Sequence, residues 1–168
     1  MAPRRLAYTS PDRFVAGSTG AGAARRFYVQ VRDGSTLATV EVSRSVLTLL
    51  ADHAVAVLDE VARLGGIDTY GSDAAVDIRP LDLPLLPVLT ADTAVVSWDS
   101  AAGLLTVELT GADQADAVAV SVTPLWARRF SLRVRRLLHE SPACPFCAQQ
   151  VSASGHVCPR LDGLRAQR

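Results

Sequence analysis

The sequence predicts an α+β fold in which two βββα halves form antiparallel sheet with helices packed on one side, followed by a small C-terminal zinc knuckle. Two separate stretches alternate apolar and polar residues as strands do, and each leads into an amphipathic helix pattern. All three cysteines fall within fifteen positions, 144–158, close to the C-terminus. The chain has 168 residues, of which 49% are hydrophobic and 20% charged, and this size and composition are typical of one globular domain.

The first half combines three strands with a long helix. Asp33-Gly34 is a tight-turn dipeptide between two of these strands. Ser43 is placed to cap the helix, in which apolar residues recur at three- and four-residue steps, and Gly65-Gly66 ends it. The strands are expected at residues 14–17, 27–31 and 37–42.

The second half repeats this order. Thr123 is a helix cap, and Pro124 occupies the first helical position, where its missing N–H costs nothing. The helix is expected from Pro124 to about His139. The strands that precede it are expected at residues 94–98, 105–109 and 117–122.

The two halves also match in register, which indicates an internal repeat. Superposing Ser43 on Thr123 places Val40 on Val120, and the apolar positions of the two helices then coincide. A further shift of two residues places Val29 on Val107 in the preceding strands.

The predicted domain covers residues 1–141, with a separate tail at 142–168. Its halves span about 1–65 and 93–141, and residues 66–92 connect them. A loop of this length is uncommon in a compact domain unless it has a role. The preferred interpretation is a crossover held on the surface by its leucines; the alternative is a functional lid. These leucines are Leu81, Leu83, Leu85 and Leu86.

Charge is balanced overall, with 17 basic and 17 acidic side chains, but it is unevenly distributed. Residues 1–32 hold six arginines and one aspartate, residues 33–123 hold three arginines and fourteen acids, and residues 124–168 hold eight arginines and two acids. The basic ends either form an arginine-rich patch or pair with the acidic middle, and internal pairing is the preferred interpretation. The chain contains no lysine, which excludes Schiff-base chemistry and a phosphate-loop lysine.

The second helix is two-faced at 100° per residue. One arc carries apolar side chains, and the opposite arc carries arginines. A solvated face is the preferred interpretation, with a surface that binds an anion or nucleic acid as the alternative. The arginine arc comprises Arg128, Arg129, Arg133, Arg135 and Arg136.

The tail carries the spacing C-x2-C-x8-H-x-C, formed by Cys144, Cys147, His156 and Cys158. Three thiolates and one imidazole are a standard tetrahedral set for Zn²⁺, and four protein ligands leave no open position for a reactive water. We therefore expect a structural zinc site. A redox pair is disfavoured because a thioredoxin-like motif would stand at the start of a helix within a βαβ unit. Cys144 instead comes after the end of the predicted helix.

Several segments together resemble an actinobacterial family, the domain-of-unknown-function family 3090. The resemblance rests on Pro11 to Gly17 at one end of the chain, and on Cys144 to Cys147 and Gly155 to Arg160 at the other. It implies a cytoplasmic protein, but it implies no activity.

The leading hypothesis is a non-enzymatic binding or adaptor protein that uses its zinc tail and arginine face to contact an acidic protein or nucleic acid. Arg128, Arg129, Arg133 and Arg136 are its candidate contact residues. The alternative is an enzyme or small-anion sensor with a groove between the halves, where Arg13, Arg25 or Arg26 holds the anion. An odd cysteine count and the absence of a targeting signal favour a location in the reducing cytoplasm. No apolar run is long enough for a membrane span. The sequence leaves open whether the protein forms a homo-oligomer.

Overall fold

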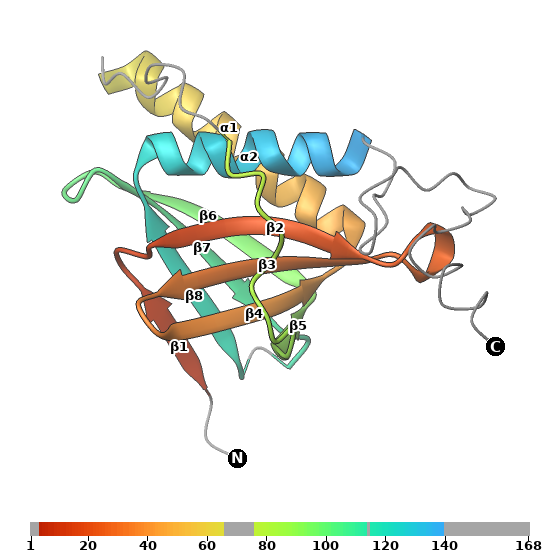
Figure 1. The fold of residues 1–168 in the computed structure, drawn as a ribbon. Helices are drawn as coiled ribbons and strands as arrows, with labels where there is room; N and C mark the ends of the chain where they lie inside the picture. Colours follow the sequence, from red (N-terminus) through yellow and green to blue (C-terminus); the bar gives the residue numbers. More distant parts are fainter. Residues whose placement is uncertain (1–3, 66–75, 114, 140–168) are drawn as a thin grey trace, which may run out of the picture.

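The computed structural model describes residues 4–65, 76–113 and 115–139, which form two four-stranded sheets and two α-helices (Figure 1). The first half contains β1 (Arg5–Tyr8), β2 (Arg13–Thr19), the short 3-10 helix η1 (Gly22–Ala24), β3 (Arg26–Asp33), β4 (Thr36–Val42) and α1 (Arg44–Gly65). The second half, which here also includes the end of the expected connection 66–92, contains β5 (Pro87–Ala91), β6 (Thr93–Asp99), β7 (Leu104–Thr110), β8 (Ala117–Val122) and α2 (Pro124–His139).

Each half contributes one antiparallel meander, and each meander is completed by a strand from the other half. The strand orders are β2-β3-β4-β5 and β1-β8-β7-β6. The outer strands β5 and β1 run parallel to β4 and β8, the last meander strands of the opposite halves. The predicted α+β fold with two βββα halves is confirmed, and this exchange of strands adds a parallel pair to each sheet.

The strand registers confirm the internal repeat. Val29 of β3 lies opposite Val40 of β4, and Val107 of β7 lies opposite Val120 of β8. These are the residues that the sequence superposition places on one another. All four side chains are buried, because alternate residues of a strand face the same side of a sheet.

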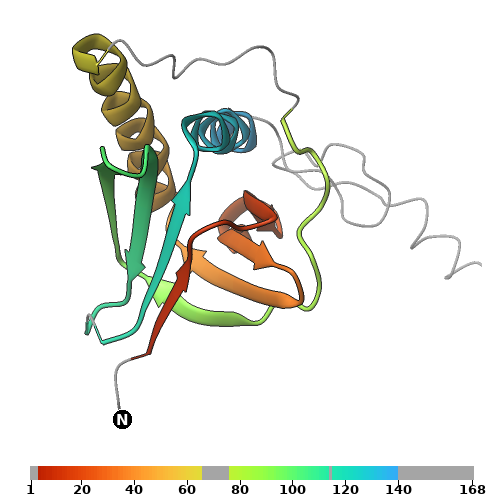
Figure 2. The same cartoon turned by 90° about the vertical axis from the view of Figure 1, so that its left-hand side faces the viewer.

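The two helices lie on one side of the molecule, as predicted (Figure 1). Figure 2 looks nearly along α2 and shows it above both sheets, with α1 beside it. Each helix packs against the other and against the first meander strand of the opposite half, so that α1 contacts β6 and α2 contacts β2. One continuous cluster of buried apolar side chains joins both sheets and both helices. Neither helix of the described ranges has the length and apolar composition needed to span a bilayer.

Both helices begin where the sequence predicts. The Ser43 hydroxyl accepts a hydrogen bond from the N–H of Val46 at 3.1 Å and so caps α1. Pro124 is the first residue of α2, and the carbonyl of Thr123 accepts the N–H of Ala127.

The strands β1 and β5 were not predicted. Each has four or five residues, and β5 begins at Pro87 inside the expected connection 66–92. Both pair with strands far away in sequence, so the local pattern carries little information about them. Proline is tolerated at the start of β5 because this is an edge strand.

Residues 76–86, here called the strap, cross the outer face of the β2-β3-β4-β5 sheet before β5 begins (Figure 1). Leu81 packs directly over Gly17 of β2, where a Cβ atom would lie 2.6 Å from the Leu81 Cγ. Leu83 and Leu86 do not hold the strap as expected, because they are 79% and 71% exposed. Polar contacts with β2 and β3 hold the strap on the sheet where these two leucines do not.

Candidate functional site

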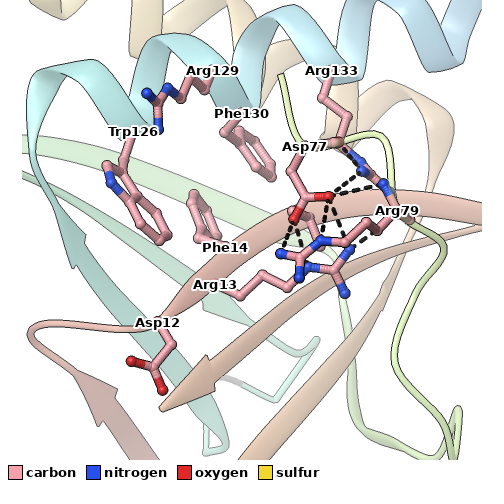
Figure 3. Close-up of a pocket in the computed structure, with 10 residues that line it drawn as sticks. Asp12, Arg13, Phe14, Asp77, Arg79, Trp126, Arg129, Phe130 and Arg133 are labelled. Carbon is pink, nitrogen blue, oxygen red and sulfur yellow. Dashed lines mark hydrogen bonds and ion pairs between the residues drawn. The ribbon is translucent and has the colours of Figure 1, made fainter. Parts of the chain in front are cut away.

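A pocket of about 180 Å³ lies where the start of β2, the strap and α2 meet. It therefore lies between the two halves of the chain, because β2 belongs to the first half and α2 to the second. Figure 3 shows arginine guanidinium groups gathered around Asp77 and aromatic rings beside them. The lining residues are Asp12, Arg13, Phe14, Val15, Asp77, Arg79, Trp126, Arg129, Phe130 and Arg133.

Arg13 is the buried centre of the contacts between the strap and the sheet. Its side chain is only 3% exposed, and a buried guanidinium is stable only when its donors have partners. The Nε atom donates to the Asp77 carboxylate at 2.8 Å, and Nη1 forms an ion pair with Asp82 at 3.1 Å. The Nη2 atom donates to the carbonyls of Arg79 and Pro80, so the strap bends around this one side chain.

Asp77 is the carboxylate on which the arginines converge. Arg79 donates to it from Nη2 at 2.7 Å and from its own backbone N–H at 2.9 Å, which forms a tight local turn. Hydrogen bonds from Arg79, and then those from Arg13, hold the pKa of Asp77 well below its usual range, although partial burial opposes this. Arg133 adds a third guanidinium, with Nη1 at 3.7 Å from the carboxylate. Asp77 is therefore ionised at neutral pH.

Arg133 joins α2 to β2 and the strap. Its Nε atom donates to the carbonyl of Ala16, Nη1 donates to the carbonyl of Asp77, and Nη2 donates to that of Arg79 at 2.8 Å. The side chain is 13% exposed, and burial lowers the pKa of this guanidinium. It lies against the strap and not on the solvated face that the helix pattern predicts.

Arg129 differs from the other arginines of the pocket. Its Nε atom is buried and has no hydrogen-bond partner among the described residues. A buried donor without a partner is uncommon in folded proteins and requires an explanation. Because Arg129 lines the pocket, a bound acceptor would supply the missing contact.

The apolar wall of the pocket joins the two halves. Phe14 of β2 and Phe130 of α2 stack with their ring centroids 4.2 Å apart and an interplanar angle of 12°. Both rings are buried, and the Trp126 ring lies beside them (Figure 3). The pocket thus combines a cationic side with an aromatic side.

The candidate arginines separate into two groups. Arg13, Arg129 and Arg133 come together at the pocket, as the small-anion hypothesis requires of Arg13. Arg128, although on the same helix, forms an ion pair with Asp59 of α1 at 2.7 Å. Arg136 is exposed on the last turn of α2.

Arg25 and Arg26 lie away from the pocket, at the far end of the β2-β3 hairpin. The Nη2 atom of Arg25 donates to the carbonyl of Leu137 at 2.7 Å, at the C-terminal end of α2, and its guanidinium lies 5.0 Å from the Phe27 ring centroid. Burial lowers the pKa of Arg25. Arg26 forms an ion pair with Glu41. Both side chains therefore have structural partners where they lie.

Ion pairs within the described residues support internal pairing between the basic ends and the acidic middle. Arg13 pairs with Asp77 and Asp82, and Arg5 pairs with Glu108. Two further pairs join α2 to α1, between Arg128 and Asp59 and between Arg135 and Asp52.

Sequence reasoning did not identify Asp77, Arg79 or the aromatic wall as site residues. The available signal was weak: Arg79 is the one arginine in an otherwise acidic, proline-rich connection, and Asp77 stands two positions before it. Phe14 and Phe130 look like ordinary core residues in the sequence pattern. Their role at the pocket depends on how α2 is placed over β2.

The four residues expected to bind zinc, Cys144, Cys147, His156 and Cys158, lie outside the described residues. Within ranges 4–65, 76–113 and 115–139, no group of three or more His, Cys, Asp or Glu side chains is placed to hold a metal ion.

Comparison with known proteins identifies a family without an assigned activity. A family model described as "Protein of unknown function (DUF3090)" matches residues 6–158. No curated protein matches, and no solved structure matches.

Proposed function

The chain belongs to this family, and because the family description assigns no activity, we propose from the geometry that the protein binds a small anionic ligand between its two halves. The observation that carries this proposal is the buried Arg129 Nε, which has no hydrogen-bond partner in the part of the chain that the structure describes and lies in a pocket lined by four arginines and two aspartates. An anion would satisfy this donor and balance the excess positive charge.

The size of the pocket favours a small ligand. Pockets for drug-sized molecules measure roughly 300–1,000 Å³, whereas this one measures about 180 Å³. The aromatic wall suits a short apolar or planar portion next to the anionic group. We therefore propose a small organic anion, and not a large cofactor.

The chemistry of the lining residues favours binding over proton transfer. Among the residues that the structure describes, no histidine, cysteine or serine side chain lines the pocket. Asp77 is a weak base because its pKa is depressed by the arginines, and arginine stays protonated near neutral pH. A sensor or carrier of an anionic metabolite therefore fits the site better than an acid–base enzyme.

The adaptor hypothesis has less support from the geometry. Arg128 and Arg133 have partners within the fold, which leaves Arg136 as an exposed member of the proposed contact surface. Our second proposal is that the protein contacts an acidic protein or a nucleic acid in the cytoplasm. It rests on Arg136 and on the cysteine-rich tail.

We also propose that Cys144, Cys147, His156 and Cys158 hold a structural zinc ion, on the strength of their spacing. Metal analysis of the purified protein should give one zinc per chain, and Cys158→Ser should lower this content. A stoichiometry well below one that Cys158→Ser leaves unchanged would refute the zinc proposal.

The anion proposal is tested by thermal unfolding in the presence of phosphate, sulfate and small carboxylates. A ligand that binds only the folded state raises the melting temperature by mass action. Arg129→Gln should abolish the rise, whereas Arg136→Gln, which removes the same charge from an exposed position on the same helix, should preserve it. No rise with any anion would refute the proposal, and an equal loss in both variants would indicate binding to the exposed face of α2 instead.

A further inference from the structure

The arrangement around Asp77 indicates which anionic group the pocket binds. Three guanidinium groups, from three different elements, point at one carboxylate: Arg13 from β2, Arg79 from the strap and Arg133 from α2. The Asp77 carboxylate offers two oxygen atoms and one negative charge to these three cations, and Asp82 adds a second negative charge through Arg13. The guanidinium cluster therefore carries more positive charge than its internal partners balance.

A phosphate monoester matches this cluster better. It presents three terminal oxygen atoms and carries about −1.5 to −2 charges at neutral pH. Guanidinium groups bind phosphate oxygens in pairs of parallel hydrogen bonds, and Arg13 and Arg79 each direct such a pair, from Nε and Nη2, at the Asp77 carboxylate.

The contacts of the strap allow the Asp77 side chain to leave while the backbone stays in place. Arg133 holds the carbonyls of Asp77 and Arg79, and Gln30 holds the backbone of Asp82. These contacts do not involve the Asp77 carboxylate. Ile78, next to Asp77, is 81% exposed, so moving the carboxylate outward removes no buried apolar contact of its neighbour.

We infer that the ligand carries a phosphate monoester and that its phosphoryl group binds Arg13, Arg79 and Arg133 in the place of the Asp77 carboxylate. The inference rests on the proposed anion-binding function and narrows its ligand class. Asp77 acts as an internal competitor that balances part of the arginine charge in the unliganded protein. The organic part of the ligand lies along Phe14 and Trp126, toward the side of the pocket where Figure 3 shows Arg129.

Calorimetric titration of the full chain with phenyl phosphate, inorganic phosphate and benzoate tests this inference. Phenyl phosphate should bind the wild-type protein most tightly, and benzoate, which has the same ring but a carboxylate, should bind at least about tenfold more weakly. Asp77→Ala should bind phenyl phosphate about tenfold or more tightly than wild type, because one set of charge-assisted hydrogen bonds no longer competes. Asp52→Ala removes the same charge from the exposed surface of α1 and should change the affinity little.

The outcomes separate the two proposals. If wild type binds phenyl phosphate and Asp77→Ala binds it equally or more weakly, displacement of Asp77 is refuted and anion binding stands. If benzoate binds as tightly as phenyl phosphate, the phosphate class is refuted. If neither protein binds any of the three probes, the anion-binding function itself fails.

A second measurement avoids dependence on the folding of Asp77→Ala. In wild-type protein, the ¹³C resonance of the Asp77 carboxyl should move toward that of a solvated aspartate when phenyl phosphate is added. An unchanged resonance at saturation would show that the ligand binds beside Asp77, which overturns the inference. Asp77→Asn provides a nearly isosteric alternative for the titration.

Discussion

Gln30 binds the backbone of Asp82 through both ends of its side-chain amide. Its Nε2 atom donates to the Asp82 carbonyl at 3.0 Å, and its Oε1 atom accepts the Asp82 N–H at 2.8 Å. The same Nε2 atom also donates to the Thr39 hydroxyl at 3.0 Å, and the Gln30 side chain is 1% exposed. A single buried amide thus fixes the strap to β3, and the arginine contacts of the pocket depend on that position.

Replacing Gln30 should loosen the strap and destabilise the fold. Gln30→Glu keeps the shape but cannot donate to the Asp82 carbonyl, and we expect a loss of about 1–3 kcal/mol in the free energy of unfolding. Urea denaturation measures this loss, and limited proteolysis should show new cleavage within residues 76–86. An unchanged unfolding midpoint would show that the strap is held by other contacts.

Gly17 should be intolerant of even one added methyl group. A Cβ atom there would lie within 2.8 Å of three Leu81 side-chain atoms, so Leu81 must move. Gly17→Ala should cost about 1–3 kcal/mol, as is typical of overpacking. Leu81→Ala makes room, so the double variant should be more stable than the sum of the two single effects implies. Strict additivity of the two effects would contradict direct contact between these residues.

The stacked pair of Phe14 and Phe130 should contribute strongly to stability because it joins the two halves. Phe130→Ala should cost about 3–5 kcal/mol through lost burial and the cavity that remains. Leu132→Ala, at a 47% exposed position of the same helix, should fall within about 0.5 kcal/mol of wild type. Equal losses in chemical denaturation would show that α2 is not held through this ring contact.

The depressed pKa of Asp77 predicts a defined pH dependence of stability. Its folded-state pKa lies below the usual value of 3.8, so the unfolded chain binds more protons at acid pH, and stability falls as pH falls. The contribution is fully present at neutral pH and is lost progressively below about pH 5. The difference in unfolding midpoint between wild type and Asp77→Asn should therefore shrink from pH 7 to pH 3. Asp52→Asn corrects for the loss of one negative charge, and a difference that does not change with pH would contradict the ion cluster.

Sequence patterns predicted the strands and helix starts that are determined by residues close together in the sequence. The pairing of Val29 with Val40, and of Val107 with Val120, follows from alternation and short turns, and Ser43 and Pro124 mark helix starts by their own chemistry. The strands β1 and β5 were missed because each is stabilised by a partner more than forty positions away, Leu6 by Val118 and Leu89 by Val40.

The candidate site was only partly predictable for a related reason. The helix period correctly places Phe130 inside, but it places Arg133 on the solvated face. Arg133 lies against the strap because three backbone carbonyls accept from it, and the helix pattern contains no information about those carbonyls. Asp77 likewise acquires its surroundings only when β2 and α2 meet around it.

The exchange of β1 and β5 between the halves has a consequence for how the molecule comes apart. Neither half forms a complete four-stranded sheet by itself. The last meander strand of each half, β4 or β8, pairs with a strand of the other half, β5 or β1. Cutting the chain between the halves would leave β4 of the first piece without β5, and β8 of the second piece without β1. The strands β1 and β5 would then each lack their partner. Loss of order in one half therefore removes a strand from the sheet of the other, and we expect the two halves to unfold as one cooperative unit.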